Sequence, residues 1–394
     1  MTPELAAAVD ALRLYLDRVG FQQICKFIVG VNQYMVAPSM ISAASAGKVE
    51  HFFDTVLYDC RELALLQCLM TGRSAARRTL SECERRLADL LIAADILREA
   101  DRGANVTAAD RQLITAFNLD LLIDRRIHFG GKVHEVYIGP DSYWMLYYID
   151  TAAIGRDHRM LDLCTGSGIA ALYLSLFSDR VVATDIGDAP LALTAINRRL
   201  NGREAMVEIR SQELSQTLDG GERFNLLTCN PPFVAYPPGI QGTLYSHGID
   251  ADGLGYLRSI IRCLPAVLTP GGCAYLVADL VGDKRRPHFA EELEHFAASD
   301  GLGIDVYIDN VLPASAQIAP LANYLARINS GRSSAQIASE LVAFQRETLR
   351  AERYYMSTIR LRTAAPKPGL RVLRRCPPPR AVSEETWPEL LLRN

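Results

Sequence analysis

The chain has 394 residues, in which 42 Lys and Arg nearly balance 45 Asp and Glu to give a net charge of −3. Its length predicts two or three domains with ample core, and no apolar stretch reaches the length that a membrane span needs. The start of the chain carries Glu4 and lacks a basic segment followed by an apolar block, so we expect no signal peptide. Nine cysteines without a Cys-x-x-Cys pair predict reduced thiols, no metal site and a cytoplasmic enzyme.

The first third of the chain reads as a helical unit. Helices are predicted over 4–19, 21–29 and 50–70, and a capping box at Ser81 and Glu84 opens a further helix through about Ala100. Residues 96–114 read as a small hairpin, so the domain predicted over 1–130 is either winged-helix-like or purely helical. A winged helix can bind DNA, but residues 1–150 hold 16 basic and 19 acidic residues. A substrate lid or a homodimer contact is therefore the preferred role.

A glycine-bearing turn follows a short apolar strand at Met160 to Leu163. The turn runs from Cys164 to Gly168 and leads into an apolar helix, whose free N–H groups suit a ligand that approaches the backbone closely. A second strand ends about twenty residues later in Asp185, where a carboxylate can accept both hydroxyls of a ribose. A nucleoside ligand is expected. The third glycine of a dinucleotide fingerprint is missing, because Ala171 stands there, so NAD is disfavoured.

The tetrapeptide Asn230-Pro231-Pro232-Phe233 follows the apolar run 224–229, at the carboxyl end of a predicted buried strand. Two prolines cannot continue a strand ladder, and they fix the local backbone. The Asn230 amide and a backbone carbonyl then offer two acceptors for the N–H groups of an amine or amide. A strand that merely ends in a proline turn is the structural alternative, and the glycine turn upstream argues against it.

In this order and spacing, the motifs resemble the class I S-adenosylmethionine (SAM) dependent methyltransferases. The branch with an Asn-Pro-Pro-aromatic motif includes glutamine methyltransferases of release factors and ribosomal protein and several rRNA guanine methyltransferases. The resemblance covers about residues 131–365 and implies SAM as cofactor. It implies that the expected cofactor-binding residues are Asp162, Cys164, Thr165, Gly166, Gly168, Asp185, Ile186, Glu213 and Asn230. Glu213 is favoured slightly over Gln212 beside the adenine amine, and Cys164 departs from the glycine common in the wider superfamily.

The resemblance also implies the rest of the fold, an α/β Rossmann-like sheet in a catalytic domain over 131–365. Residues 273–281 read as a fifth strand, and 303–312 and 354–363 as the closing antiparallel strands. A helical insertion over 315–353 is expected to cover one side of the cleft. Seven basic residues between Arg360 and Arg380 are interleaved with prolines. Residues 366–394 are therefore interpreted as a Pro- and Arg-rich extension, with RNA contact as the alternative.

Substrate contacts are expected from Pro232, Phe233, Tyr143 and Tyr236, because aromatic residues cluster at 143–148 and 236–256. Rings beside a sulfonium can hold it by cation–π attraction, although core packing is the commoner role for any single ring. His247 is a candidate proton acceptor.

We expect N-methylation of a small metabolite or a protein side chain, with Asn230 and Pro231 orienting the nitrogen. In the alternative, SAM itself is the substrate and cyclises to azetidine-2-carboxylate and methylthioadenosine. A SAM-binding module without catalysis and an RNA-binding protein are remote readings. Nucleic acid and membrane are not expected as partners.

Overall fold

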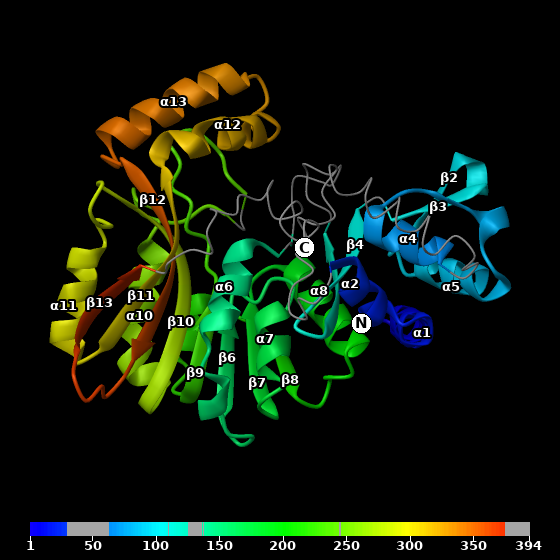
Figure 1. The fold of residues 1–394 in the computed structure, drawn as a ribbon, viewed down its shortest axis with the longest axis horizontal. Helices are drawn as coiled ribbons and strands as arrows, with labels where there is room; N and C mark the ends of the chain where they lie inside the picture. The colour runs from blue at the N-terminus through cyan, green and yellow to red at the C-terminus, as the bar shows by residue number, and fades with distance from the viewer. Residues whose placement is uncertain (30–62, 109, 125–135, 137, 244–245, 375–394) are drawn as a thin grey trace.

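The protein is built on a central eight-stranded sheet with the strand order β13-β11-β12-β10-β9-β6-β7-β8 (Figure 1). The computed structural model describes residues 1–29, 63–108, 110–124, 136, 138–243 and 246–374. Within these ranges, no helix is long and apolar enough to cross a membrane. The predicted Rossmann-like sheet is confirmed.

The elements of the sheet domain follow one another as strand and helix. They are α6 (Pro140–Tyr148), β6 (Arg159–Leu163), α7 (Ile169–Leu174), β7 (Arg180–Asp185), α8 (Asp188–Leu200), β8 (Val207–Ser211), α9 (Leu214–Asp219), β9 (Phe224–Cys229), α10 (Gly255–Val267), β10 (Leu268–Gly282), α11 (Ala290–Asp300), β11 (Gly303–Pro313), α12 (Ile318–Ala326), α13 (Ser334–Glu347), β12 (Arg353–Arg362) and β13 (Gly369–Arg374).

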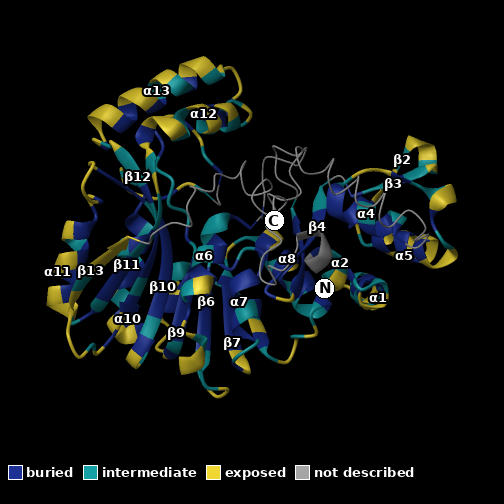
Figure 2. Ribbon diagram, in the orientation of Figure 1, coloured by how far each residue is buried: buried dark blue, intermediate teal, exposed yellow. Residues whose placement is uncertain are grey.

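Helices cover both faces of this sheet, which explains why its inner strands are mostly apolar (Figure 2). Alternate residues of β10 point to opposite faces. Tyr275 and Val277 belong to the core shared with α6, α7 and α8, whereas Leu276 and Ala278 belong to the core shared with α9, α10 and α11. Each inner strand is therefore buried on both sides.

The order in which successive strands are added to the sheet reverses between β8 and β9. Strands β6, β7 and β8 extend the sheet one way, whereas β9 pairs with the other side of β6 in parallel register, with Leu163 opposite Cys229. In open α/β sheets a crevice forms at the carboxyl ends of the strands at such a reversal. The glycine turn at 164–168 and the Asn230 motif both begin at this point.

At the far edge, β12 runs antiparallel to β10 and β11, and β13 then pairs in parallel with β11. The predicted strands at 303–312 and 354–363 are confirmed, and the insertion between them is helical, as predicted. The sequence analysis was wrong to place the last strand at 354–363, because β13 lies inside the segment interpreted as an extension. Arg371 of β13 donates to the buried carboxylate of Asp305 on β11, from Nε to Oδ1 at 2.6 Å. This basic residue therefore bonds two strands of the sheet to each other. Residues 375–394 lie outside the described part.

The N-terminal unit combines helices with small sheets. Its elements are α1 (Pro3–Val19), α2 (Phe21–Val29), α4 (Ala64–Thr71), β1 (Ala75–Ala76), α5 (Glu82–Ala93), β2 (Arg98–Ala100), β3 (Asn105–Thr107), β4 (Arg111–Ala116) and β5 (Leu119–Asp124). The predicted capping box and the hairpin, formed by β2 and β3, are present. The helix predicted to reach Ala100 ends at Ala93, because β2 takes the last residues into a three-stranded sheet. Residues 50–62 of the third predicted helix lie outside the described part.

Two asparagines at the C-terminal end of α8, Asn197 in the helix and Asn201 at its C-cap, attach this unit to the sheet domain. Asn197 is fully buried, and its Oδ1 accepts from the Leu122 N–H at 2.7 Å while its Nδ2 donates to Leu122 O at 2.9 Å. Asn201 makes the same pair of bonds with Asp120, at 3.0 and 2.7 Å. The side chains of α8 thus act as a neighbouring strand for β5. Asn197 Nδ2 also donates to Ser167 O at 2.8 Å, which reaches the glycine turn.

Asn197→Ala should lower the free energy of unfolding by about 3 kcal/mol, because it leaves buried backbone groups of Leu122 and Ser167 without partners. Asn201→Ala is the matched control. It removes equivalent bonds from a half-buried site, so its effect should be about half as large. Urea unfolding of both variants measures the difference, and equal losses would contradict the larger contribution of Asn197 to stability.

Candidate active site

A cavity of about 710 Å³ opens at the carboxyl ends of β6, β7 and β9. Its volume lies in the range of small-molecule sites. Among the residues that line it are most of the predicted site residues, which come from four separate segments of the chain. They are Asp162, Cys164, Thr165, Gly166, Asp185, Ile186, Glu213, Asn230, Pro231, Pro232 and Phe233.

The turn after β6 is shaped by backbone conformations with positive φ. Cys164, Gly166 and Gly168 have φ of 53°, 57° and 82°. A Cβ at Gly166 would make only ordinary contacts, with Val136 at 3.8 Å and the Cys164 carbonyl oxygen at 3.9 Å, so this glycine leaves room toward the cavity. A Cβ at Gly168 would lie 2.9 Å from the side chain of Thr194, so this glycine permits α7 to pack closely on α8. Gly168 does not line the cavity, and its role in the fold is to support the turn.

Asp162 holds the turn, α7 and β9 together from a buried position. Its Oδ2 accepts from Thr165 Oγ1 at 2.6 Å and from the Ala171 N–H at 3.1 Å, and its Oδ1 accepts from Thr228 Oγ1 at 2.7 Å. Burial raises the pKa of Asp162 to about 6, although these hydrogen bonds act to lower it. Its carboxylate therefore fixes the walls of the cavity.

Asp185 ends β7 and faces the turn. Its Oδ2 accepts from the Gly166 N–H at 3.1 Å, and its Oδ1 accepts from the Gly187 N–H at 3.0 Å. Burial raises the pKa of Asp185, against the effect of these bonds. Each oxygen has a further lone pair, so the carboxylate can accept two hydroxyls from a ligand in the cavity.

Gln212 and Glu213 follow β8, and the structure separates their roles. Gln212 Oε1 is buried and has no hydrogen-bond partner within the described residues. Glu213 is exposed and is the N-cap of α9, where its backbone N–H donates to Gln216 Oε1 at 3.3 Å. A buried acceptor without a partner is costly unless a ligand satisfies it, so Gln212 fits an adenine amine better than Glu213.

Asn230 is held by the first turn of α6. Its Nδ2 donates to Asp141 Oδ2 at 2.6 Å and to Ser142 Oγ at 3.3 Å. Both N–H groups of the amide then have partners inside the protein, and the acceptor Oδ1 is the group left for a ligand. The use of Asn230 as an acceptor for nitrogen stays a prediction. Phe233 is half-buried and packs between the cores on the two faces of the sheet.

The predicted aromatic contacts lie mostly outside the cavity. Tyr143 is buried on α6 against Phe117, with ring centroids 6.0 Å apart, because the inner face of α6 packs into the core. Tyr236 is also buried; its hydroxyl lies 2.9 Å from Ser246 Oγ, and its ring meets His247 edge-on at 4.9 Å. His247 lines a separate, open pocket. Tyr256 does line the cavity, whereas Tyr245 lies outside the described residues.

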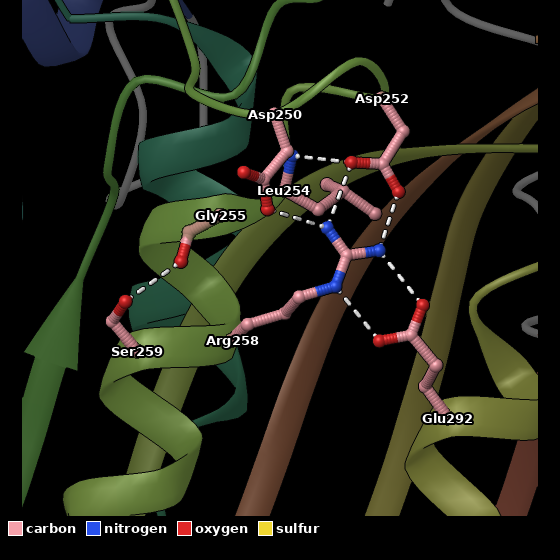
Figure 3. Close-up of polar contacts among 7 residues, drawn as sticks. All are labelled: Asp250, Asp252, Leu254, Gly255, Arg258, Ser259 and Glu292. Carbon is pink, nitrogen blue, oxygen red and sulfur yellow. Dashed lines mark hydrogen bonds and ion pairs between the residues drawn. The ribbon is translucent and has the colours of Figure 1, made fainter.

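Arg258 anchors the segment that leads from the Asn230 motif into α10 (Figure 3). Its guanidinium donates to Asp250, Asp252 and Glu292 at 2.6–3.1 Å, and its side chain is 15% exposed. The figure shows the carboxylates closing around the guanidinium from the loop and from α11. The anchored segment supplies Ile249, and α10 supplies Ser259, to the cavity wall.

The sequence analysis missed Asp141 and Ser142 as site residues, and it ranked Gln212 below Glu213. Asp141 follows Gly139-Pro140, a pattern typical of a helix start, where an acid is favourable near the helix N-terminus. This pattern is the sequence signal by which Asp141 could have been found. No sequence pattern indicates that this helix end faces Asn230.

Part of the chain is similar to a known protein family. Residues 141–243 match the protein family described as "Methyltransferase small domain". Ribosomal protein uL3 glutamine methyltransferase of Bradyrhizobium diazoefficiens is 35% identical over 169 residues, which cover 39% of this chain and 51% of that protein. Release factor glutamine methyltransferase of Xylella fastidiosa is 37% identical over 125 residues, which cover 29% and 45%. The chain thus spans about half the length of these curated relatives.

Among solved structures, the SAM-dependent methyltransferase from Agrobacterium tumefaciens aligns with a TM-score of 0.39 and 11% identity, over 65% of this chain and 71% of that one. The predicted resemblance to methyltransferases is confirmed for this matched segment. The segment contains the glycine turn, Asp185 and Asn230.

Arg258→Met should lower the free energy of unfolding by about 2 kcal/mol, because Asp252 and Glu292 lose their partner in a partly buried site. Arg286→Met, which removes a half-exposed pair with Glu294, is the control and should have almost no effect. Chemical unfolding of both variants checks this. A loss at Arg286 as large as that at Arg258 would contradict the anchoring role.

The buried Asp162 predicts a pH dependence of stability. Its pKa of about 6 in the folded protein lies above the value of about 3.9 in an unfolded chain. Between these values the folded state binds more protons, so this group makes the free energy of unfolding decrease as the pH rises from about 4 to about 6. The full effect is on the order of 3 kcal/mol.

Asp162→Asn removes this titration. From pH 4 to pH 7, the free energy of unfolding of the wild type should therefore fall by about that amount more than that of the variant. Urea unfolding at both pH values measures this difference. Asp179→Asn, in an exposed pair with Arg156, is the control. A difference between Asp162→Asn and wild type that does not change with pH would refute the prediction.

Proposed function

We propose that this chain is a SAM-dependent N-methyltransferase that methylates a side-chain amide nitrogen of a protein in the cytoplasm. The observation that carries the proposal is the orientation of Asn230, whose two N–H groups are held by Asp141 and Ser142. Its free acceptor lies at the wall of a cavity that also holds Asp185. The relatives support the choice of substrate, since those compared above are named as glutamine methyltransferases of a ribosomal protein and of release factor.

The residues of the cavity fit SAM by their chemistry. The lone pairs of Asp185 suit the two ribose hydroxyls, and the buried Gln212 Oε1 suits the adenine amine. The open side of Gly166 leaves room for the amino acid part of the ligand. When bound, SAM supplies a methyl group on a positively charged sulfur.

The protein contributes orientation to this reaction. Asn230 Oδ1 and the Pro231 carbonyl would each accept one N–H of the substrate amide, and this fixes the nitrogen in line with the methyl group. Such alignment can supply a large share of the acceleration, since effective molarities of about 10⁵ M or more are reached by well-oriented groups. In such a transfer the nitrogen would gain the methyl carbon, the sulfur would keep the electron pair of the broken bond, and one N–H proton would pass to solvent. His247 lies in the separate pocket, which weakens its candidacy as proton acceptor.

Calorimetry with SAM tests the cofactor site. Asp185→Ala should weaken binding by about 1.5–3 kcal/mol through the loss of charge-assisted bonds to the ribose. Asp179→Ala, which removes an exposed acid before β7, should bind like the wild type. Thermal melting of Asp185→Ala distinguishes a binding role from a structural role, because a structural role would lower stability while leaving the affinity for SAM intact.

The function itself is tested with purified protein, SAM and either release factor or ribosomal protein uL3, followed by mass spectrometry of the acceptor. One added methyl group on a glutamine is the expected result, and Asn230→Ala should lower the rate by about a hundredfold. Asn225→Ala, which removes an amide at the opposite end of β9, is the control for the loss of an asparagine. Methylthioadenosine released from SAM alone would instead support SAM as the sole substrate. Wild-type protein that binds SAM but methylates neither acceptor would count against the proposal.

A further inference from the structure

The contact between Asp141 and Asn230 joins segments 89 residues apart in the sequence, at the wall of the cavity. Asp141 lies in the first turn of α6, after the N-cap Gly139. Although an acid in this position is favourable near a helix N-terminus, its Oδ2 reaches across to Asn230 Nδ2 at 2.6 Å. The distance is that of a short, charge-assisted hydrogen bond.

The direction of this bond decides what Asn230 can do. An asparagine amide can be turned by half a rotation, which exchanges its donor and its acceptor. An ionised carboxylate only accepts, so Asp141 admits only the orientation with Nδ2 toward α6. The Ser142 hydroxyl takes the second N–H, which reinforces the same orientation. Oδ1 is then turned away from α6 and is available to accept.

The negative charge of Asp141 also acts on the acceptor itself. A hydrogen bond to an ionised partner polarises the amide, so electron density increases at Oδ1. The field of Asp141 extends beyond Asn230, since burial, followed by the charge of Asp141, raises the pKa of Asp279 on β10 to about 7. An Asn230 polarised in this way is a stronger acceptor for an N–H of the substrate.

We propose that Asp141 is a positioning residue for methyl transfer, which fixes and polarises the Asn230 amide so that Oδ1 accepts from the nitrogen to be methylated. The kinetic part of this inference rests on the proposed function. The orientation of the amide does not, and it can be observed in the protein alone.

Exchange of the two side chains is the sharpest test. Asn230→Asp places two carboxylates within 2.6 Å of each other, where both cannot remain ionised, so it should lower the rate of methylation by about a hundredfold or more. In the double variant Asp141→Asn with Asn230→Asp, an N–H···O bond joins the same positions in the reverse direction. Ser142 can donate to the new carboxylate, and an oxygen of residue 230 still faces the cavity. This variant should recover at least about tenfold of the lost rate, as coupled residues do in double-mutant cycles.

Single variants separate positioning from stability. Asp141→Ala should lower kcat by about tenfold and leave the dissociation constant of SAM within about threefold of the wild type, whereas Asp141→Asn, which keeps an acceptor, should retain more of the rate. Asp188→Ala removes an acid from the first turn of α8 and should leave the rate unchanged. A double variant no faster than Asn230→Asp, or an Asp141→Ala variant with wild-type kcat, overturns the proposal. If Asp141→Ala does not fold, the comparison of Asn230→Asp with the double variant decides.

A measurement without substrate distinguishes this proposal from the function on which its kinetics rest. In ¹⁵N-labelled protein, the side-chain amide signals of Asn230 are identified by their loss in Asn230→Asp. We expect them to show protected, strongly shifted protons in the wild type and to lose this protection in Asp141→Ala. Unprotected signals in the wild type overturn the positioning role. A protected amide in a protein that methylates no acceptor would instead count against the proposed function alone.

Discussion

The buried carboxylate of Asp162 is the interaction on which the site depends. It binds the turn after β6 through Thr165, the start of α7 through Ala171 and the adjacent strand β9 through Thr228. These three elements form the floor of the crevice, and the two oxygens of one carboxylate bond to all of them. The cost is a charge placed in the core, which shows as a raised pKa. The three bonds offset that cost and keep the turn in its left-handed conformations.

The rest of the site is arranged around this floor, with groups that face the cavity and other groups that hold its walls. Acceptors that are already fixed by backbone N–H groups or by neighbouring side chains face the cavity, as in Asp185 and Asn230. The surrounding walls are held by polar anchors outside the cavity, of which the Arg258 cluster is the clearest (Figure 3). Preorganised acceptors need little rearrangement when a ligand arrives, which is the condition under which polar groups contribute most to a reaction.

The sequence was sufficient to predict the elements that follow local rules. The strands around the glycine turn and the Asn230 motif alternate with helices in a pattern that fixes a doubly wound sheet, and the predicted strand ends proved to be where the cavity lies. It was insufficient where the outcome depends on tertiary contacts. Strand β13 pairs with β11 although its residues are mostly exposed, and its basic composition resembles that of a solvated tail. Likewise, the inward turn of Tyr143 and the meeting of Asp141 with Asn230 depend on how α6 lies on the sheet, which a local pattern cannot specify.

The attachment of β5 to α8 has a consequence for communication within the chain. Asn197 bonds both to Leu122 in β5 of the N-terminal unit and to Ser167 in the turn that lines the cavity. A macromolecule that binds the N-terminal unit and shifts β5 would therefore alter the turn and the affinity for its ligand. Thermodynamic linkage makes such coupling reciprocal, so a ligand in the cavity would change the affinity for that macromolecule by the same factor. The buried amide of Asn197 would thus couple binding at the N-terminal unit to binding in the cavity.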